Sequence, residues 1–169
     1  NNIKESLLFI NKEVELCFLP PRKVGKPFDV KLYTKAVLIC EMFGLTERQF
    51  RKTFEEANKK KGATGLTLLE LLEFRLDNII YTLGFAKSRP EARQMVSHGH
   101  VVVDSKKVNI PSFRVKINSV VAISAKFVDN TQVKKNLGED RTLPGWLERK
   151  ATVGKILRLP EREEMEKSV

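Results

Sequence analysis

The chain has 169 residues, with 31 Lys and Arg against 21 Asp and Glu, and a formal net charge of +10. Its hydrophobic fraction of 41% is sufficient for a packed core, and no run approaches the ~20 apolar residues that a membrane-spanning helix needs. Wholesale disorder and a helical membrane protein are therefore excluded. The basic excess favours a polyanionic partner, with nucleic acid as the first candidate.

The positive charge is concentrated in two blocks of the chain. Residues 17–61 hold 11 basic against 5 acidic side chains, and residues 85–126 hold 8 against 2, so each block has a net charge of +6. The leucine-rich residues 62–84 between them have a net charge of −2. This alternation is typical of a folded protein with a basic face, and not of a basic tail.

The chain begins with Asn1, and its first residues do not form a signal peptide. We therefore expect that the natural protein has been trimmed or is represented only in part. Cys17 and Cys40 have no second Cys or His at zinc-finger spacing. Both are expected to be reduced packing residues, and no metal site is predicted.

Helical patterns dominate the first half of the chain. Residues 20–30 are rich in Pro and Lys and predict a basic loop, and residues 31–43 predict a buried helix that stops at Gly44. Thr46 and Gln49 form a capping-box signal, and an apolar helix face follows them. That face consists of Phe50, Phe54 and Ala57.

Two further helices are predicted before the pattern changes. A broad apolar stripe over residues 68–83 predicts the strongest helix of the chain, with Thr67 and Glu70 as its capping box. Ser88 opens a shorter basic helix, which tolerates a proline in its first turn and stops at Gly99.

Short β-strands are predicted after residue 100. The three valines at 101–103, a turn at 104–107, and the apolar Val108 and Ile110 are typical of a hairpin. Further strands are expected at 115–117, 120–123 and 155–159.

The residues that carry chemistry lie on the short helix and the hairpin. Arg89, Arg93 and Ser97 are four residues apart and share one helix face, with Gln94 and His98 beside it. Two lysines at the hairpin turn, Lys106 and Lys107, extend this array. Guanidinium, ammonium, amide and imidazole donors together suit phosphate, sugar and base contacts. Eight basic against two acidic groups favour nucleic acid over a merely solvated face.

Several individual residues have alternative interpretations. Arg75 and Asp77 form either a helix-surface pair or part of an RNA contact, and Trp146 is either a packing anchor or a base-stacking group. His98 and His100 are interpreted as helix-end and hairpin residues, because no metal-ligating partner lies near them in the sequence. The glutamates after residue 160 are interpreted as a solvated face or as a contact for a basic partner.

Beyond these patterns, several runs of the sequence resemble the bacterial or organellar type of the small-subunit ribosomal protein S-four family. The run at 75–100 is the most specific, and the resemblance extends over about residues 45–162. The matching runs are RLDNIIY at 75–81, GF at 84–85, SR at 88–89, EARQMVSHGH at 91–100, ERQFR at 47–51, GATG at 62–65, PGWL at 144–147 and GKILRLP at 154–160.

The resemblance implies an α+β fold in which a helical subdomain is split in sequence by an inserted RNA-binding module. The module consists of two helices and a small antiparallel sheet. Residues 1–74 are expected to form the N-terminal helical region with its basic loop, and residues 75–140 the RNA-binding module. Residues 141–169 are expected to form a C-terminal segment that packs back on the helical region.

The implied function is that of a structural constituent of the small ribosomal subunit and a primary rRNA-binding assembly protein. Such a protein contacts the 5′ domain of small-subunit rRNA and neighbouring small-subunit ribosomal proteins, near the channel by which mRNA enters. Some members also bind their own mRNA. The implied location is the cytoplasmic ribosome of a bacterium, or the ribosome of a mitochondrion or plastid, with no membrane partner.

Ten RNA contacts are carried over from the family position by position, and they overlap the array derived from charge and helical phase. The implied contacts are Arg48, Arg51, Arg75, Arg89, Arg93, Gln94, Ser97, His98, Lys106 and Lys107.

Two other classes of protein carry a similar module and remain as alternatives. An RNA-modifying enzyme, such as a pseudouridine synthase, needs a further catalytic domain, for which the remaining residues are too few and of the wrong composition. A stand-alone stress protein that binds stalled ribosomal particles lacks the upstream and downstream matches. The sequence has no phosphate-binding loop, nucleophile elbow or zinc-protease motif, so neither an enzyme nor a cofactor is predicted.

Overall fold

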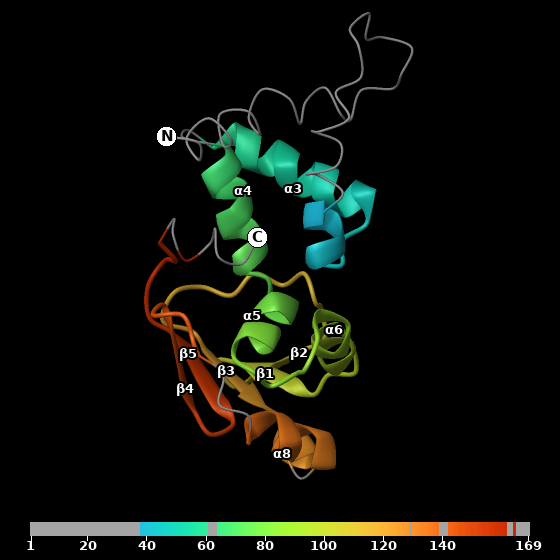
Figure 1. Cartoon of the computed structure of the whole chain (residues 1–169), viewed down its shortest axis with the longest axis vertical. Coiled ribbons are helices and arrows are strands. Elements are labelled where there is room, and N and C mark those ends of the chain that lie inside the picture. The colour runs from blue at the N-terminus through green and yellow to red at the C-terminus, as the bar shows by residue number, and fades with distance from the viewer. Residues whose placement is uncertain (1–37, 61–63, 129, 139–141, 162–163, 165–169) are drawn as a thin grey trace, which may run out of the picture. The chain divides into compact units, whose positions relative to one another are not determined.

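The computed structural model divides the chain into two compact units, which are described separately (Figure 1). The first unit runs through Leu71, and the second is Leu72–Ser168. The described residues are 38–60, 64–128, 130–138, 142–161 and 164. The predicted basic loop and the first part of the helix predicted at 31–43 lie outside these residues.

The first unit contains helices that end and begin where the sequence predicts. Residues 38–42 are helical, and Gly44 follows with a φ of 59°. Helix α3 (Glu47–Lys59) begins at the predicted capping box, in which the Thr46 hydroxyl accepts a hydrogen bond from the Gln49 amide and the Gln49 side chain accepts one from the Thr46 amide, both at 3.3 Å. The predicted apolar face is buried at Phe50, Phe54 and Ala57.

The single helix predicted over residues 68–83 is two helices in the structure. Helix α4 (Thr64–Glu73) already includes Thr67, so the capping box predicted at that residue is wrong. Helix α5 (Leu76–Thr82) begins after a break at Phe74 and Arg75.

The break between α4 and α5 is stabilised by a distant segment of the chain. Residues 111–115 run alongside it, and Arg75 and Arg114 form an isolated antiparallel bridge. The Leu76 amide donates to the Phe113 carbonyl at 2.8 Å. Because this bond satisfies one of the four amides that a helix N-terminus leaves unpaired, α5 begins at a defined residue. The strand predicted at 115–117 is replaced by this pairing.

Helix α6 (Arg89–Ser97) and the hairpin follow in the order that the sequence predicts. Gly99 ends α6 with a φ of 71°. Strands β1 (Val101–Val103) and β2 (Lys106–Val108) are joined by a two-residue turn at Asp104 and Ser105, whose φ angles of 47° and 68° are both positive, as in the turns that suit hairpins. Lys106 and Lys107 therefore lie in β2 and not in the turn, which corrects the predicted boundary.

The second unit is built around a five-stranded antiparallel sheet with the order β2-β1-β3-β5-β4. Strand β3 (Val120–Ile123) matches its prediction, and β5 (Val153–Ile156) begins two residues before the strand predicted at 155–159. Strand β4 (Leu147–Lys150) was not predicted. The C-terminal segment, expected to pack on the helical region, thus contributes two strands that join the sheet through β3.

The core of the second unit lies between one face of the sheet and helices α5 and α6 (Figure 1). Buried strand residues alternate along the sheet, as in β1, where Val101 and Val103 are buried and Val102 is half-buried. Two short helices, α7 (Ala125–Val128) and α8 (Thr131–Leu137), follow β3. Mixed helices and a small antiparallel sheet make this an α+β fold.

Candidate nucleic-acid interface

Helix α6 is held in place by caps at its first turn. The Ser88 hydroxyl accepts a hydrogen bond from the Glu91 amide at 3.4 Å, and the Glu91 carboxylate accepts one from the Lys87 amide at 2.6 Å. From α8, the buried Asn136 amide donates to the Phe85 carbonyl at 3.1 Å and to the same Glu91 carboxylate at 3.4 Å. These bonds fix the loop before α6 and therefore its first turn.

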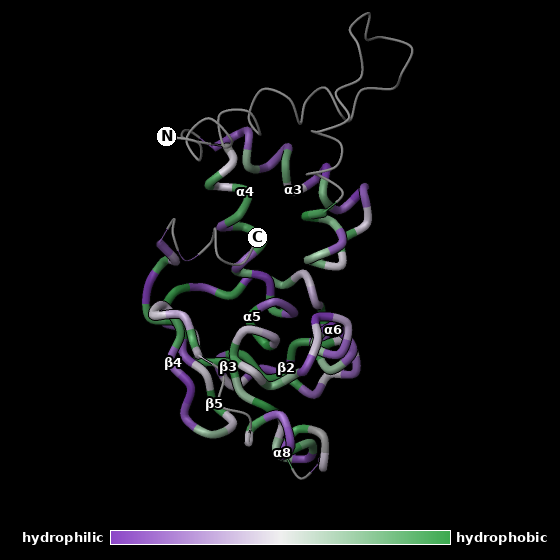
Figure 2. The backbone as a smooth tube through the Cα atoms, in the orientation of Figure 1, coloured by the Kyte–Doolittle hydropathy of each residue, from purple (hydrophilic) through white to green (hydrophobic). Residues whose placement is uncertain are grey.

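The burial pattern of α6 separates a core face from a polar face. Ala92, Met95 and Val96 are buried against the core. The polar residues are exposed or half-buried, and Figure 2 shows hydrophilic and hydrophobic stretches mixed within this helix. The polar face is thus turned away from the core at Gln94 and Ser97, whereas Arg89 and Arg93 are half-buried.

Arg93 lies on this face beside a buried ion pair of α5. The Arg75 guanidinium donates twice to the Asp77 carboxylate, at 3.0 and 2.6 Å, and both side chains are 6% exposed. The Arg93 Nε atom lies 3.7 Å from the same carboxylate, with 34% of its side chain exposed. One buried anion is therefore shared by a buried and a partly exposed arginine. This pair lies in the interior, and the helix-surface interpretation of Arg75 is wrong.

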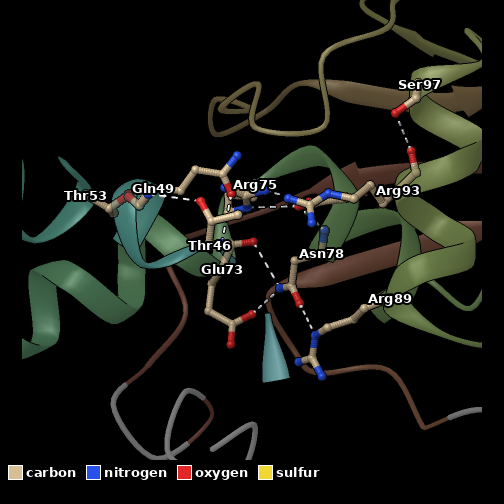
Figure 3. Close-up of polar contacts among 10 residues, drawn as sticks. Thr46, Gln49, Thr53, Glu73, Arg75, Asn78, Arg89, Arg93 and Ser97 are labelled. Atoms are coloured by element: carbon tan, nitrogen blue, oxygen red, sulfur yellow. Dashed lines mark hydrogen bonds and ion pairs between the residues drawn. The ribbon is translucent and has the colours of Figure 1, made fainter. Parts of the chain in front are cut away.

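Arg89 is held by two other residues of α5. Its Nε atom donates to the side-chain oxygen of Asn78 at 3.1 Å, and its guanidinium carbon lies 4.7 Å from the centre of the Tyr81 ring. The Asn78 amide in turn donates to the Glu73 carboxylate at 2.7 Å. Figure 3 shows that Arg89 and Arg93 reach α5 from successive turns of α6.

The C-terminal end of α6 lies beside β2. A side-chain carbon at position 99 would collide with the Lys107 side chain, so this lysine lies over Gly99. His100 stacks on Phe127, with ring centres 3.9 Å apart and an angle of 7° between the rings. Burial, and then the nearby His98 and Lys107, lower the pKa of His100 and favour its neutral form.

Seven of the ten predicted contacts lie on α6, directly after it, or on β2, all in the second unit. Gln94 and Ser97 are exposed on α6, where the Ser97 hydroxyl donates to the Arg93 carbonyl at 2.8 Å, and His98 is exposed directly after it. Lys106 and Lys107 are exposed on β2. Arg89 and Arg93 complete this set. We call these seven residues the α6–β2 face: Arg89, Arg93, Gln94, Ser97, His98, Lys106 and Lys107.

The remaining three predicted contacts lie elsewhere. Arg48 and Arg51 are exposed on α3 of the first unit, where Arg51 lies 3.8 Å from the Glu47 carboxylate. Arg75 is buried behind the α6–β2 face. Its visible role is to hold Asp77.

Asn78 and Tyr81 were not predicted as parts of the site. The signal that pointed to Asn78 is an amide in the middle of an apolar helix stripe, because buried polar groups are nearly always hydrogen-bonded. For Tyr81 the sequence offered no signal, since its contact with Arg89 depends on how α5 and α6 meet.

The contacts of two further side chains decide how those residues are interpreted. Trp146 is 2% exposed and lies against Phe74 with ring centres 5.8 Å apart, so it is a packing anchor. Glu164 accepts two hydrogen bonds from Arg158, each at 3.0 Å. Burial opposes ionisation of Glu164, but hydrogen bonds from the Glu161 amide and from Arg158 outweigh it, and its pKa is lowered. This ion pair explains one of the C-terminal glutamates.

Within the described part of the chain, no helix has both the length and the hydropathy of a transmembrane span. Among the same residues, no group of three or more His, Cys, Asp or Glu side chains is placed to hold a metal ion.

Comparison with known proteins gives two family matches that adjoin. Residues 30–73 match the family described as "Ribosomal protein S4/S9 N-terminal domain", and residues 74–121 match the family described as "S4 domain". A protein of Ruminiclostridium cellulolyticum named "Small ribosomal subunit protein uS4" is 41% identical over 149 residues, covering 86% of this chain and 71% of that protein. The chain belongs to the ribosomal protein S4 (S-four) family.

Other relatives with the same name are more similar over a shorter stretch. The protein of Thermoanaerobacter sp. (strain X514) is 49% identical over 126 residues, or 73% of this chain and 61% of the relative. That of Fusobacterium nucleatum subsp. nucleatum is 48% identical over 127 residues, or 74% and 65%. The chain thus spans less than two thirds of the length of these two S4 relatives.

Proposed function

We propose that this S4-family chain is a structural constituent of the small ribosomal subunit and binds rRNA directly. The supporting comparison is its 41–49% identity to bacterial proteins named as small ribosomal subunit proteins. In this proposal the chain is a primary assembly protein that recognises the 5′ domain of small-subunit rRNA. It lies near the channel by which mRNA enters, beside neighbouring small-subunit proteins.

The observation that carries the proposal is the exposed α6–β2 face. Two arginines on α6 and two lysines on the edge strand β2 present cations from two elements of one unit, which meet where the Lys107 side chain lies over Gly99. Phosphate contacts supply most of the affinity of such faces, and the amide and hydroxyl of Gln94 and Ser97 are suited to sugar or base contacts. Arg48 and Arg51 on α3 form a second proposed contact region.

We extend the proposal to the organisation of the chain. Residues 1–74 form the helical region, residues 75–140 the RNA-binding module and residues 141–169 the C-terminal segment. The meeting of the two family matches between residues 73 and 74 supports the first of these boundaries. The bacterial origin of the relatives favours the cytoplasmic ribosome of a bacterium over that of an organelle.

Competition binding tests the proposed RNA target. The chain is titrated with a labelled 5′-domain fragment of small-subunit rRNA, against unlabelled fragment or unrelated RNA of equal length. We expect at least a tenfold preference, roughly, for the 5′ domain at physiological salt, because specific contacts add to the charge term that all RNA shares. Equal competition by both RNAs would show that the chain binds RNA without a preference for the 5′ domain.

Co-sedimentation with small ribosomal subunits separates the proposal from its alternatives. A structural constituent stays with the subunit through repeated pelleting at moderate salt. A modifying enzyme leaves after its reaction, and a stress protein enriches on stalled particles. Loss from intact subunits in the first wash would contradict the proposed role.

A further inference from the structure

Two buried residues of α5 each hold one of the two arginines of the α6–β2 face. Asp77 and Asn78 are adjacent in sequence and only 5% and 2% exposed. Asp77 lies 3.7 Å from the Nε atom of Arg93, and Asn78 accepts a hydrogen bond from the Nε atom of Arg89. Arg89 and Arg93 are four residues apart, or about 6 Å along the helix axis.

The orientation of the Asn78 amide is set by Glu73. Its nitrogen donates to the Glu73 carboxylate at 2.7 Å and to the Glu73 carbonyl at 3.3 Å. The reversed amide would place its oxygen against two acceptors and its nitrogen against a guanidinium, which has no acceptor atoms. Glu73 therefore directs the Asn78 oxygen towards Arg89.

Tyr81 holds Arg89 in a second way. The guanidinium carbon lies 4.7 Å from the centre of the tyrosine ring, which is within the range of a cation–π contact. Tyr81 and Asn78 are three residues apart and therefore share a face of α5. One Nε hydrogen bond and one ring contact together restrict both the position and the plane of this guanidinium.

We propose that Asn78 is a positioning residue for RNA binding. It fixes Arg89 by a hydrogen bond one turn before Arg93, which Asp77 holds by an ion pair, so that both guanidinium forks are set in advance for neighbouring phosphates of one RNA strand. This inference rests on the proposed function. Prior ordering of long side chains reduces the conformational entropy lost on binding, and a guanidinium held through Nε presents its fork in a fixed direction.

The sharpest test changes the shape of Arg89 and keeps its charge. Arg89→Lys retains one positive charge but has no planar fork and no Nε atom in a position to bond Asn78. We expect Arg89→Lys to lose nearly as much affinity for the 5′-domain fragment as Arg89→Ala, about 5- to 30-fold in each case. Wild-type affinity in Arg89→Lys would overturn the proposal, because charge alone would then suffice.

A double-mutant cycle tests the part played by Asn78. Asn78→Ala alone should weaken binding about as much as Arg89→Ala, and adding it to Arg89→Ala should cause little further loss. The slope of log affinity against log salt should fall in magnitude by about 0.7–0.9 in each single variant and no further in the double variant, as expected for one shared phosphate contact. Losses that multiply in the double variant would contradict positioning.

A matched control on α5 separates positioning from general damage. The Thr82 hydroxyl donates to the Asn78 backbone carbonyl at 2.9 Å, so Thr82→Ala perturbs the same helix without touching Arg89. This variant should bind like the wild type, with thermal unfolding by circular dichroism confirming that all variants are folded. If the wild type itself does not prefer the 5′ domain, the proposed function fails. If the preference holds and the cycle is additive, only the positioning role fails.

Discussion

At the scale of single residues, the site depends on a buried carboxylate that pairs with two arginines. Asp77 accepts two hydrogen bonds from Arg75 and one from the backbone amide of Asn78, so both of its oxygens are used within the protein. A buried charge is tolerated when it is paired and hydrogen-bonded. The sequence already showed the spacing of Arg75 and Asp77. It could not show that the pair is buried, because residues 111–115 that adjoin it are distant in the chain.

Breaking this pair should destabilise the protein strongly. Asp77→Asn leaves the Arg75 guanidinium buried without its anion, and we expect a loss of about 3–5 kcal/mol in the free energy of unfolding, measured in urea. Glu148→Gln is the control, because it removes the anion of an exposed pair whose Lys150 side chain is 83% exposed. Such pairs contribute little, so the control should unfold like the wild type. Equal stability of the two variants would show that Asp77 is not needed to neutralise Arg75.

At the scale of elements, close contact between β5 and α5 sets the position of the helix on the sheet. A Cβ atom at Gly154 would overlap the Leu83 side chain, which is fully buried. The Arg149 guanidinium on β4 also donates to the Leu83 carbonyl at 2.9 Å. The C-terminal end of α5 is thus held by both C-terminal strands.

Substituting Gly154 should separate these elements. Gly154→Ala forces Leu83 or the strand to move, and we expect a cost of about 1–3 kcal/mol in urea unfolding. Gly138→Ala is the matched control, because a Cβ atom there would lie 3.5 and 3.6 Å from the carbonyl oxygens of Lys135 and Lys134, which are ordinary contact distances. An unchanged Gly154→Ala variant would mean that α5 does not depend on this close approach.

The hairpin turn is attached to β3 by Asp104, through its backbone amide, which donates to the Val120 carbonyl at 2.9 Å, and through its carboxylate. Asp104 accepts hydrogen bonds from the Val120 amide and the Ser119 hydroxyl, both at 2.8 Å, and these bonds lower the pKa of Asp104. The ionised form is therefore the stabilising one. Its contribution is present above the ordinary aspartate pKa and is lost as pH falls through the lowered value.

Thermal unfolding across the acid range checks this dependence. Asparagine tolerates the positive φ of this position, but it offers one neutral acceptor oxygen in place of the two charged oxygens of the carboxylate. At pH 7 the Asp104→Asn variant should therefore melt at a lower temperature than the wild type. The difference should begin to shrink as pH falls below the ordinary aspartate pKa of about 4, and should shrink further as pH passes the lowered value at which the folded wild-type carboxyl becomes protonated. A difference that stays constant from pH 7 to pH 2 would show that the charge of Asp104 has no part in the attachment.

The elements that the sequence predicted correctly are those with local signals. The α3 capping box, Ser88 before α6 and the apolar run of β3 depend on residues close together in the chain. Strand β4 was missed because Glu148, Arg149 and Lys150 give no apolar alternation, which is common in an edge strand. The break before α5 was missed because its hydrogen-bond partners come from residues 111–115.

At the scale of the whole molecule, the net charge of +10 is less informative than its distribution. The sheet of the second unit has lysines near both edges: Lys106 and Lys107 on β2, and Lys150 and Lys155 on β4 and β5. Of these four lysines, Lys107 lies against the end of α6, over Gly99. The proposed RNA interface thus includes one edge of the sheet, and lysines near the other edge provide the control for a general effect of positive charge.

Paired removal of these lysines tests that claim most directly. Lys106→Ala with Lys107→Ala, and Lys150→Ala with Lys155→Ala, each remove two charges and leave the same net charge. The affinity of both double variants for the 5′-domain fragment is to be measured over a series of salt concentrations. The β2 variant should bind more weakly, with a salt slope smaller in magnitude by about 1.4–1.8, while the β4–β5 variant stays near the wild type. Equal losses in both variants, or a larger loss in the second, would contradict an RNA interface on the α6–β2 face.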